Sequence, residues 1–128
     1  MRFAFRKLKV EVANAKQSRE ETERLIHFDP LTGLSSRLDC EQKYSALKEN
    51  FDKNADQISL LFLDIDNFKS INDFYNHSTG DAVLQEISNR LLGLVQEKDI
   101  ACRLSGDEFV LIITRPKNFN LNQLAQRI

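Results

Sequence analysis

Residues Ile58–Asp66, with the sequence ISLLFLDID, decide the fold that this chain can adopt. The stretch begins as an almost continuous apolar run, which is typical of a strand that is buried on both faces. The run ends abruptly at Asp64, and Asp66 follows two positions later. Because residues i and i+2 of a strand project to the same side, we expect both carboxylates to face one site while Ile65 points into the core.

A predicted hairpin carries a second pair of acids. Two apolar runs, residues 100–104 and 108–114, flank a short turn that contains Gly106. A tight glycine-containing turn between two apolar runs predicts a β-hairpin. Asp107 and Glu108 lie at this turn, where the second strand begins.

The two acidic clusters together predict a metal site. If the hairpin lies beside the first strand, the carboxylates of Asp64 and Asp107 converge, and because like charges repel, the arrangement needs a cation. Oxygen ligands at an open site favour Mg²⁺, which keeps waters and takes substrate phosphates as further ligands. This is the layout of metal-assisted phosphoryl or nucleotidyl transfer. Each cluster alone is also explained by a solvated strand end or by ordinary turn chemistry, which would leave a small α/β domain on a dimerising helix.

A long helix is predicted at the start of the chain. Residues 1–27 contain no Gly or Pro and are rich in helix formers. Apolar residues recur there at seven-residue spacing, but the pattern is broken at Arg19 and Thr22, so only a short parallel coiled coil is expected. The helix stops at Asp29, because the residue before Pro30 is pushed out of the α region.

This boundary divides the chain into a helical stalk at residues 1–28 and a globular domain at residues 29–128. Four further helices are predicted in the globular domain, each from apolar periodicity or from a polar residue that can cap its first turn. They are a helix capped by Ser35 or Ser36 that runs to about Phe51, a short helix around Phe68–Tyr75, a longer helix after Gly80, and a last helix capped by Asn118 or Asn120.

Composition excludes several classes of protein. Lysine and arginine total 18 against 19 for aspartate and glutamate, so the net charge is −1 and we expect no nucleic-acid partner. With 41% hydrophobic and 29% charged residues, the 128 residues suit one soluble domain with a short extension. The apolar runs are far shorter than the roughly 20 residues of a transmembrane helix, and without a signal peptide we expect a cytoplasmic protein. Cys40 and Cys102 lack metal-binding spacing and are expected to be reduced, buried thiols.

Four motifs follow one another along the chain. They are Asp29–Leu34 (DPLTGL), Phe62–Asp73 (FLDIDNFKSIND), Gly80–Asp81, and Ser105–Phe109 (SGDEF). In order and spacing they closely resemble the GGDEF family of bacterial diguanylate cyclases, which condense two GTP molecules into cyclic di-GMP. The resemblance implies an α/β (α+β), palm-like fold with a ferredoxin-like antiparallel sheet of the nucleotide-cyclase type and flanking helices, preceded here by the stalk.

The resemblance also implies roles for the acidic residues. Asp64 and Asp107 would hold Mg²⁺, or Mn²⁺ in its place, with the backbone carbonyl of Ile65 as a further ligand. Two residues are expected to be catalytic. Glu108 would activate the 3′-hydroxyl of GTP, either by proton abstraction or by helping to hold the metal, and Lys69 would neutralise charge on the triphosphate.

A GTP site and a homodimer follow from the same resemblance. Asn72 and Asp81 would hydrogen-bond the guanine, and Phe68 and Gly106 would complete the substrate site. Each subunit would hold one GTP. Two subunits, joined through the stalk and through domain faces, must therefore face each other, so that one hydroxyl lies in line with the other nucleotide's α-phosphorus.

The sequence departs from the family pattern at three places. Ser105 stands where the family has glycine, and if that position needs a positive φ or a close approach of phosphate, the side chain would cost about 1 kcal/mol or more. Ser36 replaces the asparagine that usually precedes the arginine of the first motif. The family's product-inhibition motif, RxxD, becomes Gln96 to Asp99 here, so we expect no product feedback of that type.

The family domain also continues beyond Ile128, with a strand, a helix and a terminal strand. The domain at residues 29–128 is therefore expected to be C-terminally incomplete, with a bare apolar edge on the strand that ends at Asp64. We expect a diguanylate cyclase-type enzyme whose turnover as this chain is weak or absent. The alternative is a degenerate GGDEF module that binds GTP or mediates dimerisation or regulation without catalysis.

Overall fold

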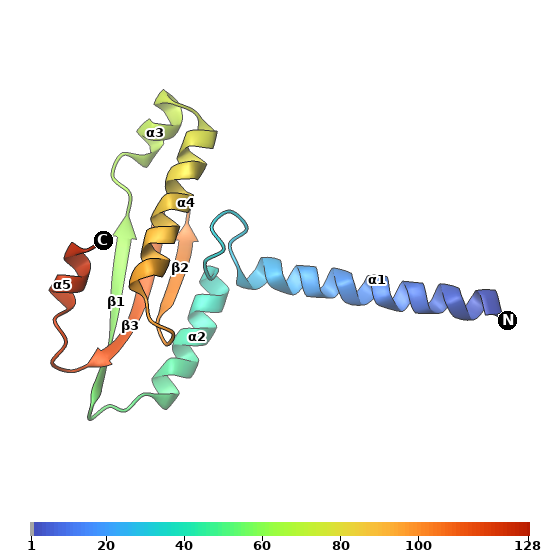
Figure 1. The fold of residues 1–128 in the computed structure, drawn as a ribbon, viewed down its shortest axis with the longest axis horizontal. Helices are drawn as coiled ribbons and strands as arrows, with labels where there is room; N and C mark the ends of the chain where they lie inside the picture. The colour runs from blue at the N-terminus through green and yellow to red at the C-terminus, as the bar shows by residue number, and fades with distance from the viewer. Residues whose placement is uncertain (1) are drawn as a thin grey trace.

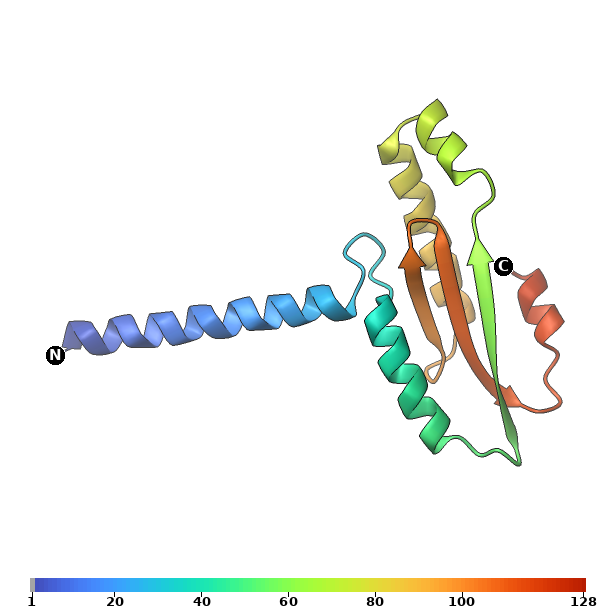
Figure 2. The same cartoon turned by 180° about the vertical axis from the view of Figure 1, so that it is seen from behind.

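A computed structural model describes the backbone of residues 2–128 and the side chains of residues 9–128 (Figure 1). A long helix projects from a mixed unit of one sheet and four helices (Figure 2). The elements in chain order are α1 (Arg2–His27), α2 (Arg37–Asn50), β1 (Asp56–Asp64), α3 (Phe68–Phe74), α4 (His77–Leu94), β2 (Ile100–Ser105), β3 (Glu108–Pro116) and α5 (Leu121–Gln126). In the described residues, no helix is long and apolar enough to cross a bilayer.

The three strands form an antiparallel sheet in the order β1-β3-β2. Strand β3 is central, and its register places Asp64 of β1 opposite Glu108. The predicted hairpin is confirmed, and it does lie beside the first strand. Pairing between β2 and β3 is irregular between Arg103 and Ser105, just before the turn.

Helices cover the two faces of the sheet. On one face, α4 and α5 bury Leu84, Leu91 and Leu124 against Phe109 and Leu111 of β3. On the other face, α2 lies over β2 and the alternate residues of β3. The cluster there contains Cys40, Ile100, Cys102, Val110 and Ile112. Successive side chains of β3 therefore point to opposite faces of the sheet, and helices bury them on both faces.

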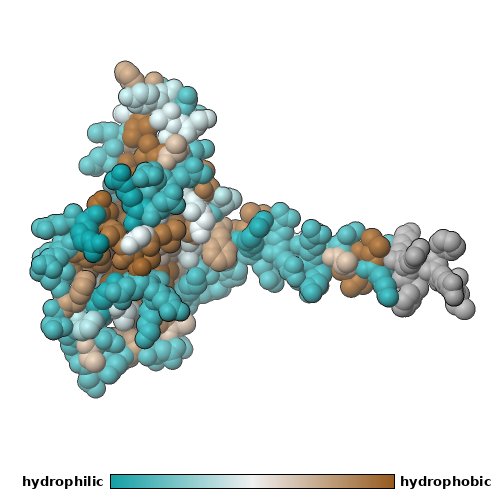
Figure 3. Space-filling model, viewed as in Figure 1, coloured by the Kyte–Doolittle hydropathy of each residue, from teal (hydrophilic) through white to brown (hydrophobic). Residues whose placement is uncertain are grey.

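Strand β1 is an edge strand, and the prediction that it is buried on both faces is wrong for one face. Leu61 and Leu63 pack toward α4 and α5, but Leu60 is 40% exposed and Phe62 is 72% exposed. The reason is the position of α2, which in the described part of the chain covers β2 and β3 rather than β1. Apolar side chains also reach the surface between α4 and α5 (Figure 3).

Local capping sets where the helices begin. Ser36 caps α2, and Asn120 caps α5, as the sequence predicts. Helix α4 begins at His77, earlier than the predicted start after Gly80, because the Asn76 side chain accepts a hydrogen bond from the Thr79 N–H at 2.7 Å.

Two aromatic residues at the end of the short helix, either of which could continue its apolar pattern, lie outside the core. Phe74 and Tyr75 are 86% and 68% exposed, and their rings contact each other edge to face. Phe5 and Leu8 belong to the seven-residue apolar pattern that predicts a short coiled coil. Their side chains lie outside the part of the chain whose side chains the structure describes.

The turn between α1 and α2 is organised around Asp29. Its carboxylate accepts hydrogen bonds from the Thr32 N–H and hydroxyl at 2.9 and 2.8 Å. The guanidinium of Arg103 donates to both carboxylate oxygens of Asp29 at 3.1 to 3.2 Å, and both side chains are mostly buried. Gly33 closes the turn with φ +73°, a conformation that favours glycine.

These contacts lower the pKa of Asp29. Burial of the carboxyl raises its pKa, but the hydrogen bonds from Thr32 and Arg103, together with the positive charge of Arg103, outweigh burial. A carboxyl whose pKa is lower in the folded protein stabilises the fold above its unfolded pKa, roughly 3.9. That stabilisation is lost as the pH falls through the folded value.

We expect Asp29→Asn to lower the melting temperature at pH 7, because the amide removes the ion pair with Arg103. The difference between wild type and variant should shrink as the pH falls below about 4, and it should vanish below the lowered pKa of the folded carboxyl, where the wild-type side chain is also neutral. Thermal unfolding followed by circular dichroism from pH 7 to pH 2.5 measures both. Asp73→Asn, at an exposed position on α3, is the matched control. An equal deficit of Asp29→Asn at every pH would contradict this account.

Candidate functional site

Three acidic residues meet at one end of the sheet. Asp64 is the last residue of β1, opposite Glu108, and the Ile65 N–H donates to the carbonyl of Asp107 at 3.2 Å. The charge of Asp107 is the largest of several causes that raise the pKa of the Asp64 carboxyl. Desolvation, a side-chain hydrogen bond with Asp107, and the charges of Glu108 and Asp66 also raise it. Asp64 and Asp107 are therefore close enough to repel each other, and a cation between them would relieve that repulsion.

The prediction that Asp64 and Asp66 share one face of a strand is wrong. The strand ends at Asp64, and Asn67, with φ 59°, turns the chain into α3. Asp66 is consequently an exposed residue of this turn, and Ile65 is half-buried against the core, as expected.

The donors at this site are few but suit magnesium. Among the described residues, no group of three or more His, Cys, Asp or Glu side chains could together hold a metal. Asp64, Asp107 and the backbone carbonyl of Ile65 would be the donors of a metal at this position. Mg²⁺ is usually bound by one or two carboxylates, with water and substrate phosphates completing its shell. The residues present therefore fit a magnesium ion that is shared with a phosphate-bearing substrate.

A second group of candidate residues lies where α3 passes α4. Gly80 is buried, and a β-carbon at this position would lie 2.9 Å from Cγ of Asn72 and 3.3 Å from Cζ of Phe68. Only glycine leaves room for these side chains. Gly80, the residue before Asp81, therefore allows Asn72 to lie against the first turns of α4. Asp81 and Lys69 are exposed on α4 and α3.

The turn that joins β2 and β3 is held by Arg103. Its Nε and Nη2 atoms donate to the carbonyl of Gly106 at 3.1 and 2.9 Å, while Nη1 binds Asp29. Sequence reasoning missed Arg103, since an arginine before a hairpin turn gives no sign of a partner far away in the chain. The guanidinium thus joins the turn after the stalk to the turn that carries Asp107.

The serine at the first position of the turn acts through its side chain. Among the described residues, only Asn67 and Gly33 have positive φ, so neither Ser105 nor Gly106 needs a left-handed backbone. The predicted backbone cost of Ser105 is therefore absent. Instead, its hydroxyl donates a hydrogen bond to Oε2 of Glu108 at 2.9 Å.

Asp99 is the last residue of the segment that stands in place of RxxD. Its side chain is buried and accepts hydrogen bonds within the protein. Its oxygens accept hydrogen bonds from Arg115 at 2.7 and 2.8 Å and from the Gln96 N–H at 2.7 Å. The side chain of Asp99 is 0% exposed.

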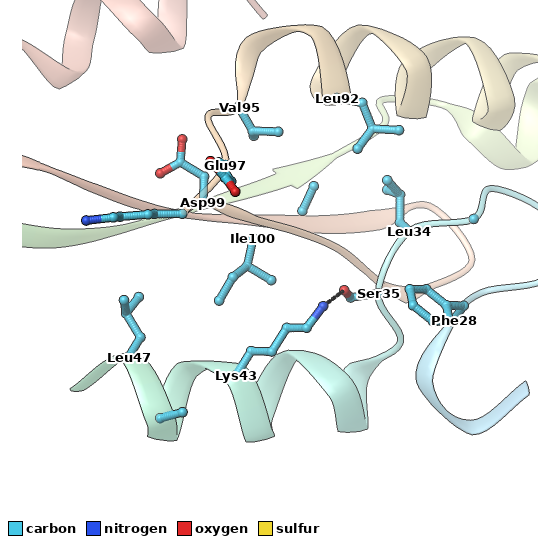
Figure 4. A pocket seen from close by; sticks show the side chains of 14 residues that line it. Phe28, Leu34, Ser35, Lys43, Leu47, Leu92, Val95, Glu97, Asp99 and Ile100 are labelled. Atoms are coloured by element: carbon cyan, nitrogen blue, oxygen red, sulfur yellow. Dashed lines mark hydrogen bonds between the residues drawn. The ribbon is translucent and has the colours of Figure 1, made fainter. Parts of the chain in front are cut away.

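A cavity of about 440 Å³ opens between α2 and the end of α4, away from the acidic residues (Figure 4). Apolar side chains such as Leu47 and Val95 form most of its wall, and Lys43 donates to Ser35 across one side at 3.3 Å. Lys43 also pairs with Asp39 at 2.8 Å. Asp39 lies 3.1 Å from Nδ1 of His27, the last residue of α1. The cavity therefore borders the junction between stalk and domain rather than the acidic site.

Among known proteins, the chain is similar to several diguanylate cyclases. Diguanylate cyclase TpbB of Pseudomonas aeruginosa is 39% identical over 87 residues, which are 68% of this chain and 20% of that protein. Diguanylate cyclase DgcS of Shewanella oneidensis is 37% identical over 100 residues, 78% of this chain and 33% of that protein. The chain thus spans a third or less of these curated relatives.

Solved structures agree on the fold. The GGDEF domain of TpbB from Pseudomonas aeruginosa superposes with a TM-score of 0.69 at 35% identity, covering 79% of this chain and 59% of that one. The coiled coil and GGDEF domain of DgcB from Caulobacter crescentus, solved with c-di-GMP, gives a TM-score of 0.73 at 27% identity, covering 94% and 62%. The family described as "Diguanylate cyclase, GGDEF domain" matches residues 26–128. The chain, with its antiparallel sheet and flanking helices, therefore belongs to the GGDEF domain family.

Proposed function

We propose that this chain is a diguanylate cyclase-type domain that binds Mg²⁺ and GTP and, as a homodimer, condenses two GTP molecules into cyclic di-GMP. The approach of the Asp64 and Asp107 carboxylates carries the proposal, because two mutually repelling acids at a strand end suit a cation that also binds phosphate. The cytoplasmic location predicted from the sequence stays a prediction.

In this proposal each residue group has a separate task. Asp64, Asp107 and the Ile65 carbonyl hold the metal, which would supply positive charge beside the triphosphate when bound. Lys69 adds charge on the same phosphates. Glu108 accepts the proton of the 3′-hydroxyl. The hydroxyl oxygen attacks the α-phosphorus of the other nucleotide, and pyrophosphate leaves.

Guanine binding belongs to the α3–α4 contact. Asn72 and Asp81 would hydrogen-bond the base edge, with Phe68 beside them and Gly106 leaving the turn open to the nucleotide. Support comes from Gly80, whose missing side chain makes room for both Asn72 and Phe68. An aspartate can accept hydrogen bonds from the N–H groups of guanine, which would give the site a preference for this base.

The stalk would bring two such sites together. Val10, Val12, Leu25 and Ile26 are each 44% to 62% exposed along α1, so apolar surface is available for a second copy of the helix. Pairing of two stalks raises the effective concentration of one domain for the other, which a reaction between two bound nucleotides requires.

The second candidate is a module that binds GTP or dimerises without catalysis. One observation favours it: the Ser105 hydroxyl already occupies Oε2 of Glu108, the group proposed to accept the proton. We also propose that product feedback through an RxxD-type site is absent, because Gln96 lacks a guanidinium and Asp99 is held by Arg115.

GTP should raise the melting temperature of the chain only when Mg²⁺ is present. At a hundredfold excess over Kd, binding adds about 2.7 kcal/mol to the free energy of unfolding. Asp81→Ala should abolish this shift, whereas Glu86→Ala, an exposed acid on the same helix, should retain it. Differential scanning fluorimetry with and without EDTA measures the effect. Chromatography of the nucleotides then separates a cyclase, which yields cyclic di-GMP, from a binding module. A shift of equal size without metal, or in Asp81→Ala, would refute the proposed site.

Gly80→Ala and Gly93→Ala should have opposite effects, although both lie in α4. Nothing lies within 4 Å of a β-carbon at Gly93, so alanine there should stabilise the helix by about 0.5 to 1 kcal/mol. At Gly80 the same methyl group would displace Asn72, costing about 1 to 3 kcal/mol and weakening GTP binding by about tenfold. Urea unfolding and GTP titration measure the two effects. If Gly80→Ala were as stable as Gly93→Ala and bound GTP normally, the proposed position of Asn72 would be wrong.

A further inference from the structure

The two cysteines of the chain, which are far apart in the sequence and were predicted to be reduced, buried thiols, lie in one cluster of the structure. Cys40 on α2 and Cys102 on β2 belong to one apolar cluster where α2 packs on β2, and each thiol shifts the pKa of the other. The chain contains two cysteines in total, so an intramolecular disulfide can join only this pair.

Cys40 is placed to form the thiolate. It lies in the first turn of α2, where its N–H donates to the Ser36 carbonyl at 2.9 Å, and the positive end of a helix dipole favours an anion there. The interaction with Cys102 lowers the pKa of Cys40 in spite of burial and of the charges of Asp39 and Glu41, whereas the interaction with Cys40 and burial raise the pKa of Cys102. The position of Cys40 at the start of α2 therefore makes it, rather than Cys102, the thiol favoured to ionise.

Cys40 is also the thiol that a small molecule can reach. It borders a groove of about 220 Å³ between α2 and β1, whose walls include Arg37, Tyr44 and Phe62. Cys40 is 6% exposed, whereas Cys102 is 0% exposed and lies behind it. The uncovered outward face of β1 leaves this groove open, so a small oxidant has access to one sulfur and not to the other.

We propose that Cys40 and Cys102 form a reversible disulfide, with Cys40 as the thiol attacked by peroxide and Cys102 as the resolving thiol. The Cys40 thiolate attacks hydrogen peroxide, so that an S–O bond forms, the O–O bond breaks, and the departing hydroxide becomes water. Cys102 then displaces the hydroxyl group from the Cys40 sulfenic acid. The S–S bond forms, and the proton of Cys102 leaves with that hydroxyl as a second water. Two thiols lose two electrons, and peroxide gains them; a dithiol reductant reverses the change.

The proposed bond lies between two ion-pair groups. Asp39, beside Cys40, contacts His27 of the stalk, and Arg103, beside Cys102, binds Asp29 and the Gly106 carbonyl. A disulfide would fix α2 against the strand that leads into the acidic turn. Its formation does not depend on the proposed cyclase function, so the two proposals can fail separately.

The test uses the reduced 128-residue chain treated with hydrogen peroxide under native conditions. Titration in denaturant should show loss of both free thiols, and mass spectrometry should show a monomer lighter by about two hydrogens with a peptide linking Cys40 to Cys102. Dithiothreitol should restore both thiols. The oxidised chain should melt about 5 °C or more above the reduced chain, since the bond closes a long loop. Retention of both thiols, or cross-links only between chains, would overturn the proposal.

Single variants test the order of the steps. In Cys102→Ser, dimedone should trap a sulfenic acid at Cys40, whereas in Cys40→Ser the remaining thiol should react about tenfold or more slowly. Circular dichroism verifies that each variant is folded. If a variant does not fold, the peptide linking Cys40 to Cys102 in the wild-type chain still tests whether the disulfide forms. Wild-type chain unfolded in urea is the matched control. If it forms the disulfide as fast as the folded chain, or if Cys102 is trapped as readily as Cys40, the assigned roles are wrong.

Discussion

The antiparallel register between β1 and β3 is the constraint on which the candidate site depends. It runs from Asp56 opposite Pro116 to Asp64 opposite Glu108 without a break. Because side chains alternate between the faces of a strand, a shift of one residue would turn every apolar side chain of β3 to the opposite face. Both faces of β3 are buried, by α4 and α5 on one side and α2 on the other, so such a shift would disrupt both clusters. The packing of apolar residues thus brings the acids together, although these residues need not contact a substrate.

The turn after β2 depends on a different interaction. Regular pairing with β3 is lost after Arg103, and the guanidinium of this residue takes over by binding the Gly106 carbonyl. The same guanidinium binds Asp29 with little solvent around the pair, where an ion pair contributes more than on the surface. The turn that follows the stalk and the turn that carries Asp107 therefore share one anchor. Any rearrangement at the end of α1 that moves Asp29 also acts on the acidic turn.

Local signals were sufficient to predict much of this fold. The hairpin follows from two apolar runs around a short turn, and α2 follows from Ser36 and its apolar periodicity. Where a prediction was wrong, the cause was an interaction that the pattern does not contain. Helix α4 starts at His77 because Asn76 happens to cap it. The exposure of Phe62 depends on where α2 lies over the sheet, and an apolar run alone does not specify which neighbour covers each face.

Ser105 illustrates how the site itself exceeds what a motif can predict. Its departure from glycine suggested backbone strain, yet its φ is not positive, and the residue acts through its hydroxyl on Glu108. The distinction changes the physics of the site, because relief of strain would alter the turn as a whole. Loss of a hydroxyl donor would instead free one carboxylate oxygen and leave the turn, held by Arg103, in place. The backbone of the signature turn and the availability of its glutamate are therefore set by separate residues.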